Sequence, residues 1–212
     1  MKKKILTLVL AIAFVFGLVP AFSAGFVADA ATPMIAYGAN HTVELKSDGT
    51  VWCCGNNTYG QLGDKTYQSK NPAVQAYGLT NVVAVAAGAN HSMALKSDGT
   101  VWAWGYGGAG QLGIGLTTNW NYPVQVNFLS GVTKIACGDN HSLALKSDGT
   151  VWGWGLNNVG QLGDGTTIPR VFPTKCIKVS FAAAGIEAYA NQSCARSSNQ
   201  TIWFGTLNTM TA

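Results

Sequence analysis

The chain has 212 residues, of which 48% are hydrophobic and only 10% are charged, and it contains 26 glycines and 7 tryptophans. This composition argues against intrinsic disorder and favours an all-β, turn-rich protein with a hydrophobic core. The formal net charge of +4 is too small to indicate binding to nucleic acid or to an acidic membrane surface.

Residues 1–30 have the pattern of a secretory signal peptide. The basic stretch Met1–Lys4 precedes an apolar run from Ile5 to Val19, and small residues follow up to Ala30. This run is shorter than the about 20 residues that a membrane span needs. We therefore expect export and removal of the segment, which leaves a secreted or extracellular protein without a stable membrane span. Retention of the run as a membrane anchor is the alternative.

The rest of the chain repeats with a period of 50 residues. His41, His91 and His141 each begin almost the same block, which continues through Ser-Asp-Gly-Thr-Val-Trp to a Gly-Gln-Leu-Gly segment. Short β-prone segments follow, which makes about four strands in each repeat. A fixed period of this length indicates a propeller, a solenoid or another array. The predicted units are repeats at 31–81, 82–131 and 132–179 and a partial, divergent fourth repeat at 180–212.

The centre of each block is a predicted β-hairpin. The Asp-Gly pair within Ser97–Thr100 favours a two-residue type I′ turn, because both residues tolerate the positive φ that this turn requires. Pairing outward from such a turn places Leu95 opposite Trp102 on a bulky face and Ala94 opposite Ala103 on a small face. We expect neighbouring hairpins to stack with a bulky face against a small face.

The first and fourth repeats depart from this pattern. Glu44 and Cys53 replace the small-face pair in the first repeat, and Cys54 stands where the second repeat has Trp104. A charged residue there predicts a terminal face that no other repeat covers, and sequence drift at a tolerant position is the alternative. The fourth repeat lacks both the histidine and the Ser-Asp-Gly-Thr turn, so we expect a degraded unit.

The pattern G-x-N-H-S-x-A-L-K-S-D-G-T-V-W-x-W-G followed by G-Q-L-G, over roughly residues 32–180, resembles the repeat of the regulator of chromosome condensation family, including its secreted bacterial members. The resemblance implies a β-propeller of four-stranded antiparallel blades. Three complete blades and a degraded fourth would form a partial or open propeller: a fragment of a longer product, an open arc, or a subunit that completes a ring by association. We expect self-association through the open blade ends.

A fold of this kind does not by itself define a function. The founding eukaryotic member of the family is a guanine-nucleotide exchange factor, an activity that we do not expect of an exported and weakly charged chain. Secreted bacterial members imply protein binding through blade loops. We therefore expect a non-enzymatic module that binds an extracellular protein or a cell-surface polymer and needs no cofactor. The alternatives are a secreted enzyme acting on an extracellular glycan or peptide, and a truncated repeat protein without independent function.

The candidate binding residues lie in the segments that differ between repeats. Residues common to all repeats build the scaffold, whereas an irregular partner requires a surface that varies from blade to blade. Tyr, Trp and Arg are enriched at interface hot spots. Packing at the outer edge of a blade is the alternative role for the larger aromatic residues. The candidates are Tyr59, Tyr67 and Lys70 in the first repeat, Tyr106, Trp120 and Tyr122 in the second, and Arg170 and Phe172 in the third.

No residue pattern indicates a catalytic or metal site. The repeated histidines have no second ligand at metal-binding spacing, so we expect them to be structural and hydrogen-bonded between blades. Gly55–Gly60 has the outline of a phosphate-binding loop, but Gln61-Leu62 replaces the Lys-Ser or Lys-Thr that such a loop requires. The five cysteines do not recur at the repeat period, which argues against a zinc site or a repeated disulfide framework. Their odd number leaves at least one thiol free or paired between chains.

Overall fold

The computed structural model describes residues 31–205, and the predicted signal peptide at 1–30 lies outside this range. Every regular element within 31–205 is a β-strand. The strands form three four-stranded antiparallel sheets and one three-stranded sheet, in which strands pair in the order of the sequence. The predicted all-β architecture of three complete blades and a degraded fourth is therefore confirmed.

Each sheet forms one blade, numbered here from the N-terminus. Blade 1 contains β1 (Met34–Tyr37), β2 (His41–Leu45), β3 (Val51–Gly55) and β4 (Lys70–Gln75). Blade 2 contains β5 (Val82–Ala87), β6 (His91–Lys96), β7 (Val101–Gly105) and β8 (Trp120–Gln125). Blade 3 contains β9 (Val132–Cys137), β10 (His141–Lys146), β11 (Val151–Gly155) and β12 (Arg170–Lys175). Blade 4 contains β13 (Ala183–Tyr189), β14 (Gln192–Ser197) and β15 (Ile202–Phe204).

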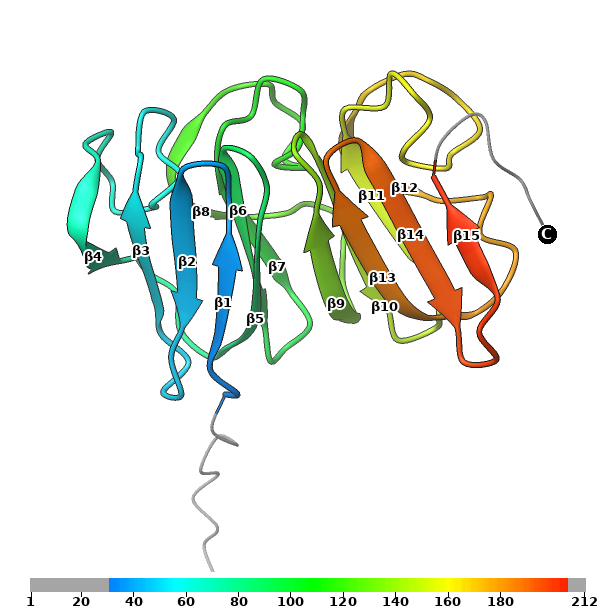
Figure 1. The fold of residues 1–212 in the computed structure, drawn as a ribbon, viewed down its shortest axis with the longest axis horizontal. Helices are drawn as coiled ribbons and strands as arrows, with labels where there is room; N and C mark the ends of the chain where they lie inside the picture. The colour runs from blue at the N-terminus through cyan, green and yellow to red at the C-terminus, as the bar shows by residue number, and fades with distance from the viewer. Residues whose placement is uncertain (1–30, 206–212) are drawn as a thin grey trace, which may run out of the picture.

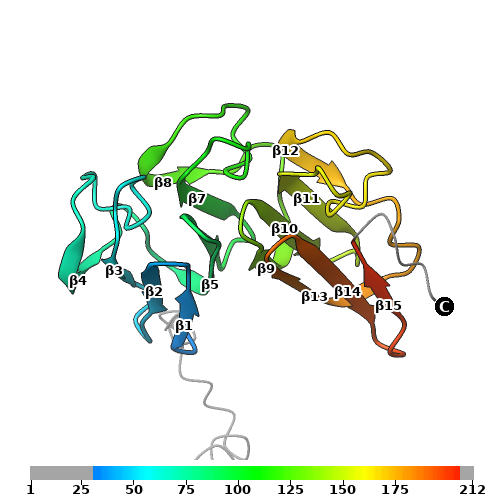
Figure 2. The same cartoon turned by 45° about the horizontal axis from the view of Figure 1, so that its top comes forward.

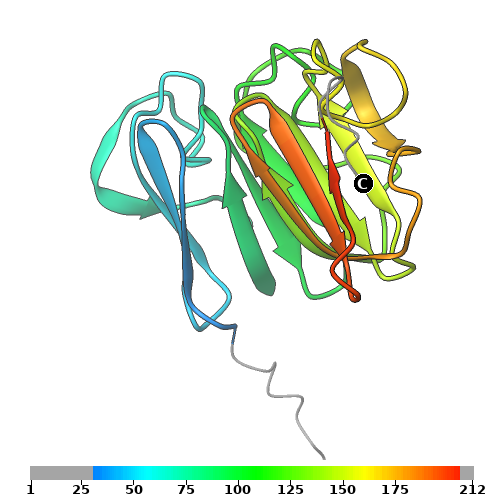
Figure 3. The same ribbon diagram turned by 45° about the vertical axis from the view of Figure 1, so that its right-hand side comes forward.

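The four blades stand side by side in an open arc (Figures 1 and 2). The first strands of the blades, β1, β5, β9 and β13, lie next to one another on the inner side of the arc. Strands β4, β8 and β12 form its outer edge. Blade 1 contacts blade 2, blade 2 contacts blade 3, and blade 3 contacts blade 4, and Figure 3 shows blade 1, in blue and cyan, at the left of the molecule. The described chain is thus an open propeller with two terminal sheets.

The central hairpin of each repeat has a three-residue loop, and the predicted two-residue turn is wrong. In blade 2 the Lys96 amide donates to the Thr100 carbonyl (2.9 Å), and the Gly99 amide donates to the Lys96 carbonyl (2.9 Å). Gly99 has a φ of 78°, which only glycine adopts without strain. The Asp98 carboxylate accepts hydrogen bonds from the amide and hydroxyl of Thr100. The Asp-Gly pair therefore marks a tight turn, but with one more loop residue than predicted.

This additional residue shifts the register between β6 and β7 by one position and changes the predicted composition of both faces. Leu95 pairs with Val101 rather than with Trp102, and Ala94 pairs with Trp102 rather than with Ala103. A shift of one residue places every β7 side chain on the opposite face relative to β6. Each hairpin therefore has a back face toward the following blade and a front face toward the preceding one. In blade 2 the back face carries Met93, Leu95, Val101 and Ala103, and the front face carries Ser92, Ala94, Trp102 and Trp104.

The hydrophobic core is divided between the blade interfaces. The back face of blade 1 packs with Ala94 and Trp104 of blade 2, and the back face of blade 2 packs with Ala144 and Trp154 of blade 3. The third interface joins the back face of blade 3 to Ala195 and other residues of blade 4. Each blade is therefore stabilised mainly by its immediate neighbours.

The terminal blades carry the expected irregularities in a different arrangement. Glu44 and Cys53 do not form a pair on one face: Glu44 pairs with Trp52 on the front face of blade 1, and Cys53 pairs with Val43 on the buried back face. Cys54 shares the front face with Glu44. Within residues 31–205 no other sheet packs on this front face. The predicted pairing of Glu44 with Cys53 was wrong, and whether another chain covers the Glu44 face stays a question for the inference below.

Candidate functional site

The loops after β3 and β7 meet through two of the predicted binding residues. Tyr59 of blade 1 and Tyr106 of blade 2 are both half-buried, and their ring centroids are 5.0 Å apart. Gly60 follows Tyr59 and lies so close to the backbone of Asn121 in β8 that a Cβ atom would come within 2.5 Å of it. The first loop therefore rests directly on the outer strand of the next blade.

A second aromatic pair lies on β8 itself. Trp120 and Tyr122 are two residues apart on one side of the strand, and their rings meet edge to face at 5.2 Å. Trp120 packs against the buried cluster between blades 2 and 3. It is thus partly a packing residue, as the alternative interpretation proposed, and Tyr122 extends the same half-buried surface.

The third aromatic pair joins blade 2 to blade 3 and includes a residue that sequence reasoning missed. Phe128, in the connection after β8, is 83% exposed, and its ring lies 5.4 Å from that of Phe172 on β12, which is 40% exposed. The Phe172 ring lies over Gly115 of the β7–β8 loop. The only sequence signal for Phe128 is an aromatic residue outside the repeat pattern.

The two basic candidates have a structural role in their loops. Arg170 donates to the Asp164 carboxylate at 2.7 Å, and the Lys70 ammonium lies 3.9 Å from the Asp64 carboxylate. Burial would raise the pKa of Asp164, but hydrogen bonds from Thr166 and Arg170 outweigh it and hold that pKa below its ordinary value. These contacts fix the loops, so the structure shows neither cation free for a partner.

Blade 2 replaces this polar loop network with apolar side chains. In blade 3 the Asn157 amide donates to Asp164 and to loop carbonyls, and blade 1 repeats this arrangement through Asn57. At the equivalent positions of blade 2, Gly107 replaces the Asn, Ile114 replaces the Asp and Trp120 replaces the basic residue. Ile114 and Trp120 pack on the core instead. The second loop is therefore the one that departs from the repeat, and all three aromatic pairs include residues of blade 2 or its loops.

These residues define a candidate binding surface, called here the aromatic loop surface. Tyr67, another predicted residue, lies in the blade 1 loop with 53% of its surface exposed, but no aromatic contact joins it to the pairs. The surface consists of Tyr59, Tyr106, Trp120, Tyr122, Phe128 and Phe172.

The histidines form hydrogen bonds between blades, as predicted. His41 and His91 contact the hydroxyls of Ser92 and Ser142 in the following blades at 2.9 and 3.0 Å, and His141 contacts Ser193 at 2.8 Å. Ser92 donates its single hydroxyl proton to the main-chain carbonyl of Gln61 (2.8 Å). His41 must therefore donate from Nε2 to the serine oxygen.

The same carbonyl completes an interblade network. Gln61 also accepts a hydrogen bond from the Trp104 indole at 2.9 Å, and Gln111 accepts equivalent bonds from Ser142 and Trp154 at 2.9 and 2.8 Å. The Gly-Gln-Leu-Gly segment of one blade is thus bound to the hairpin of the next.

Burial keeps these histidines neutral. It lowers the pKa of His91 to about 3 and those of His41 and His141 to about 4, from an ordinary 6.5. Nδ1 of each ring has no hydrogen-bond partner among the described residues, which agrees with the neutral tautomer protonated at Nε2. The histidines are therefore parts of the scaffold.

The residues 48–95, 98–145 and 148–185 match the model of the regulator of chromosome condensation (RCC1) repeat. The chain belongs to the RCC1 repeat family. In this RCC1-repeat protein the motif residues of the interblade network, His, Ser, Trp and Gly-Gln-Leu-Gly, are those that recur at the 50-residue period.

Known proteins with the same repeat are much longer than this chain. The human probable E3 ubiquitin-protein ligase HERC3 is 46% identical over 46 residues, which are 22% of this chain and 4% of that protein. The crystal structure of human WBSCR16 shows the same fold with a TM-score of 0.75 and 24% identity, over 82% of this chain and 47% of that one. Prp20p from Saccharomyces cerevisiae has a TM-score of 0.70 and 26% identity, over 81% and 44%. The RCC1-repeat chain thus spans less than half of each.

The five thiols of this RCC1-repeat protein are unpaired in the structure. Burial raises the pKa of the thiols of Cys53, Cys137 and Cys176, which lie within the blade interfaces. Cys54 and Cys194 are half-buried, and they lie on the two terminal sheet faces. No group of three or more His, Cys, Asp or Glu residues in 31–205 is arranged to hold a metal ion. The same range contains no helix of the length and apolarity that a membrane span requires.

A pocket of about 330 Å³ lies where the inner strands of the four RCC1 blades end. Its wall contains equivalent turns around Gly38, Gly88, Gly138 and Ala190. Backbone hydrogen bonds join these turns from blade to blade at 2.8 to 3.1 Å. A Cβ atom on Gly88 would come within 2.2 Å of the His91 ring, so this glycine is required by the interblade network. The pocket therefore lies on the inner side of the arc.

Proposed function

We propose that this RCC1-repeat chain is an exported protein-binding module and that the aromatic loop surface contacts the partner. The observation that carries the proposal is the loss of repeat symmetry at blade 2. Its loop exchanges a self-contained polar network for apolar side chains, and Phe128 and Leu116 beside it are 83% and 49% exposed. Aromatic residues that the scaffold does not need are typical of interface hot spots.

The relatives support binding of proteins as the general function. Prp20p is described with its binding properties to Gsp1p and histones. The match to HERC3 is confined to 4% of that protein, so the ligase activity in its name provides no argument for an enzyme here. The partner of an exported chain would be an extracellular protein, since a nuclear GTPase and chromatin lie in another compartment.

A non-enzymatic role is part of the proposal. The histidines are held neutral in the interblade network, and a nucleophilic thiol requires a lowered pKa, whereas the buried cysteines have raised values. Export is supported by the basic and apolar pattern of residues 1–30. Mass spectrometry of the secreted protein should find a chain that begins near Ala31, and detection only of the intact chain inside the cell would contradict export.

The binding surface is tested by capture on the immobilised protein. Phe128→Ala and Tyr67→Ala remove exposed rings, so each should leave thermal stability within about 0.5 kcal/mol. If these loops contact the partner, each variant should weaken capture of a protein from the culture medium by about 1–3 kcal/mol. Ile177→Ala, which removes an exposed aliphatic side chain (64%) from the connection after β12, is the matched control.

Three results would contradict the proposal. Equal capture by wild type and both loop variants would exclude the aromatic loop surface and its blade 1 neighbour. Loss of capture in Ile177→Ala to the same degree would show a non-specific contact. Recovery of the partner in cleaved or covalently modified form would contradict a purely binding role.

A further inference from the structure

The three internal blade interfaces are built on one plan. At the first, His41 bonds Ser92, and Leu45 shares a buried cluster with Ala94. The small Cys53 side chain lies in that cluster with the large Trp104. The second interface repeats the plan with His91 and Ser142, Leu95 and Ala144, and Ala103 and Trp154. Each back face therefore supplies His, Leu and a small residue, and each front face supplies a hydroxyl, Ala and Trp.

The front face of blade 1 keeps part of this plan although no described residue covers it. Ile35 occupies the register position of Val85 in blade 2 and Ile186 in blade 4. Those two side chains are 3% and 6% exposed, whereas Ile35 is 52% exposed. Thr42 has the hydroxyl position of Ser92. This face thus has the residues of an interface without a neighbour in the described chain.

The same front face differs from the plan at two positions. Glu44 stands in the position of Ala94, and Cys54 stands in that of Trp104. The first change introduces a negative charge, and the second removes a large side chain.

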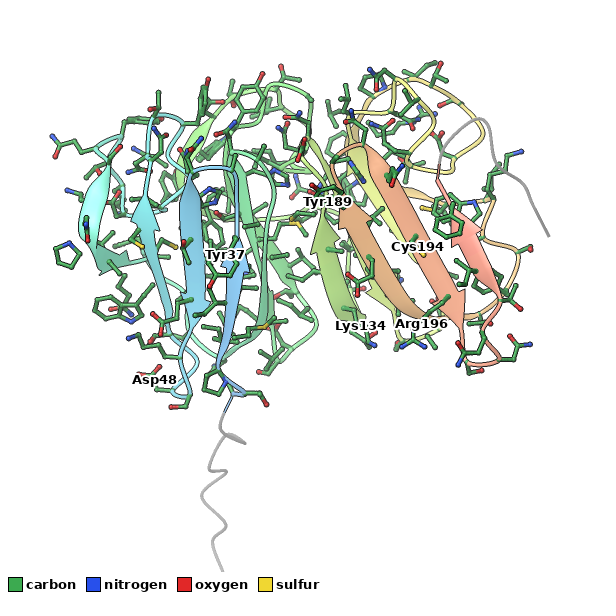
Figure 4. All side chains as sticks on the ribbon, viewed as in Figure 1. Tyr37, Asp48, Lys134, Tyr189, Cys194 and Arg196 are labelled. Carbon is green, nitrogen blue, oxygen red and sulfur yellow. The ribbon has the colours of Figure 1, made fainter. Side chains whose placement is uncertain are left out.

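The back face of blade 4 also departs from the plan, but it gains a positive charge and a large side chain. In its register Arg196 replaces Leu95, Phe204 replaces Ala103, and Gln192 replaces His91. Arg196 and Cys194 lie on β14, on the sheet face turned away from blade 3 (Figure 4). Phe204 is 54% exposed.

The two end faces are therefore complementary in charge at the Glu44 and Arg196 positions and in size at the Cys54 and Phe204 positions. Each face also carries the other charge, because the Lys46 ammonium lies 3.7 Å from the Glu44 carboxylate and Glu187 pairs with Cys194 on the face of Arg196. If the two end faces packed in the same way as the internal interfaces, Arg196 would lie opposite Glu44. These are the positions at which Leu lies opposite Ala between the blades of one chain. Phe204 would fill the space that Cys54 leaves where Trp occurs inside the arc. Gln192 would lie beside Thr42 in place of the His and Ser pair. Changes that compensate on two surfaces of one chain indicate that the surfaces meet.

We propose that two copies of this chain pack head to tail, the back face of blade 4 in each copy against the front face of blade 1 in the other. The matched part of the chain spans 47% and 44% of the two structures described above, so two copies together are about as long as one of those chains. A closed pair covers all four terminal faces and leaves no such face for a third copy. This proposal is independent of the aromatic loop surface.

One residue requires a local departure from the common plan. Tyr189 stands in the position of Gly88, where a Cβ atom would come within 2.5 Å of a carbonyl of the next blade. The contact between copies must therefore be wider at the inner end of the strands than inside the arc. Gln192 pairs with Tyr189 and lies in this wider part, whereas Arg196 pairs with Gly185, further along the sheet.

The test is a charge exchange read by sedimentation velocity. At micromolar concentration the purified protein should sediment at about twice the mass of one chain. Arg196→Glu and Glu44→Arg should each weaken the pair at least tenfold, because like charges would then face each other. The double variant Glu44→Arg with Arg196→Glu restores opposite charges and should recover the pair. Lys178→Glu, a charge reversal at an exposed position away from both faces, should leave it unchanged.

A monomeric wild type at these concentrations would overturn the proposal, as would polymers of increasing length in place of a discrete pair. Failure of the double variant to recover association, with circular dichroism showing the native fold, would refute the Glu44 and Arg196 register. If one single variant does not fold, the proposal is tested by the sedimentation mass of the wild type and by the effect of the other single variant. Because partner capture through the loops is measured separately, failure of either proposal leaves the other intact.

Discussion

The buried histidines predict a steep loss of stability in mild acid. In the folded chain burial holds the pKa of His91 at about 3 and those of His41 and His141 at about 4, whereas an unfolded histidine has its ordinary value of about 6.5. The stabilisation of the neutral form is complete above pH 6.5 and declines as the pH falls toward the folded pKa values. At pH 5 each histidine should cost about 2 kcal/mol of unfolding free energy, since one pKa unit corresponds to about 1.4 kcal/mol.

Three histidines together should therefore remove about 6 kcal/mol between pH 7.5 and pH 5, a large share of the about 5–15 kcal/mol typical of a domain. Urea unfolding at both pH values, followed by circular dichroism, measures this loss. His91→Gln should lower stability at pH 7.5 by about 1 kcal/mol through the lost hydrogen bond. It should also reduce the acid loss by about one third, because one titrating group is absent.

Ser142→Ala is the matched control for this experiment. It breaks the hydrogen bond of His91 but keeps the buried imidazole, so the full acid loss should remain. The reasoning is refuted if His91→Gln and wild type lose the same free energy between pH 7.5 and pH 5. It is also refuted if the wild type has equal stability at both pH values.

Four further outcomes follow from the packing. Trp104→Ala should cost about 3–5 kcal/mol, because this fully buried ring also donates to the interblade network, and Tyr67→Ala should change thermal unfolding little. On the folded chain diluted below the concentration at which copies pair, a thiol reagent should label Cys54 and Cys194, whereas the three buried thiols should react only after denaturation, as peptide mass mapping would show. Gly99→Ala should destabilise by about 1 kcal/mol or more in a urea titration, because its φ of 78° is unfavourable for any residue with a Cβ.

Much of the fold could be predicted from the sequence because the same pattern of strands and turns occurs in three repeats. The 50-residue period, the strand-rich composition and the turn residues led to four-stranded blades, and the recurrence of His91 with its neighbours led to hydrogen bonds between blades. The register could not be predicted. Asp98-Gly99 suits both a two-residue turn and the three-residue loop that forms, and a difference of one residue changes the composition of both faces.

The candidate site was less accessible to sequence reasoning. Variation between repeats located the loops correctly, but it did not separate residues that hold a loop from residues that the scaffold leaves free. Arg170 forms an ion pair with Asp164, six positions earlier in the chain, and only the folded loop reveals this pair. Phe128 was missed because it lies after β8, outside the segment between the outer strands.

The blade 2 loop begins at main-chain anchors, which has a practical consequence. The carbonyls of Gln111 and Gly113 accept hydrogen bonds from the neighbouring segments, so these anchors do not depend on the side chains of residues 116–118. Residues 116–118 in the blade 2 loop are exposed and lie between these anchors and β8. A foreign peptide could be grafted at this position and displayed on a rigid support, with selection acting on the insert while the blades keep their packing.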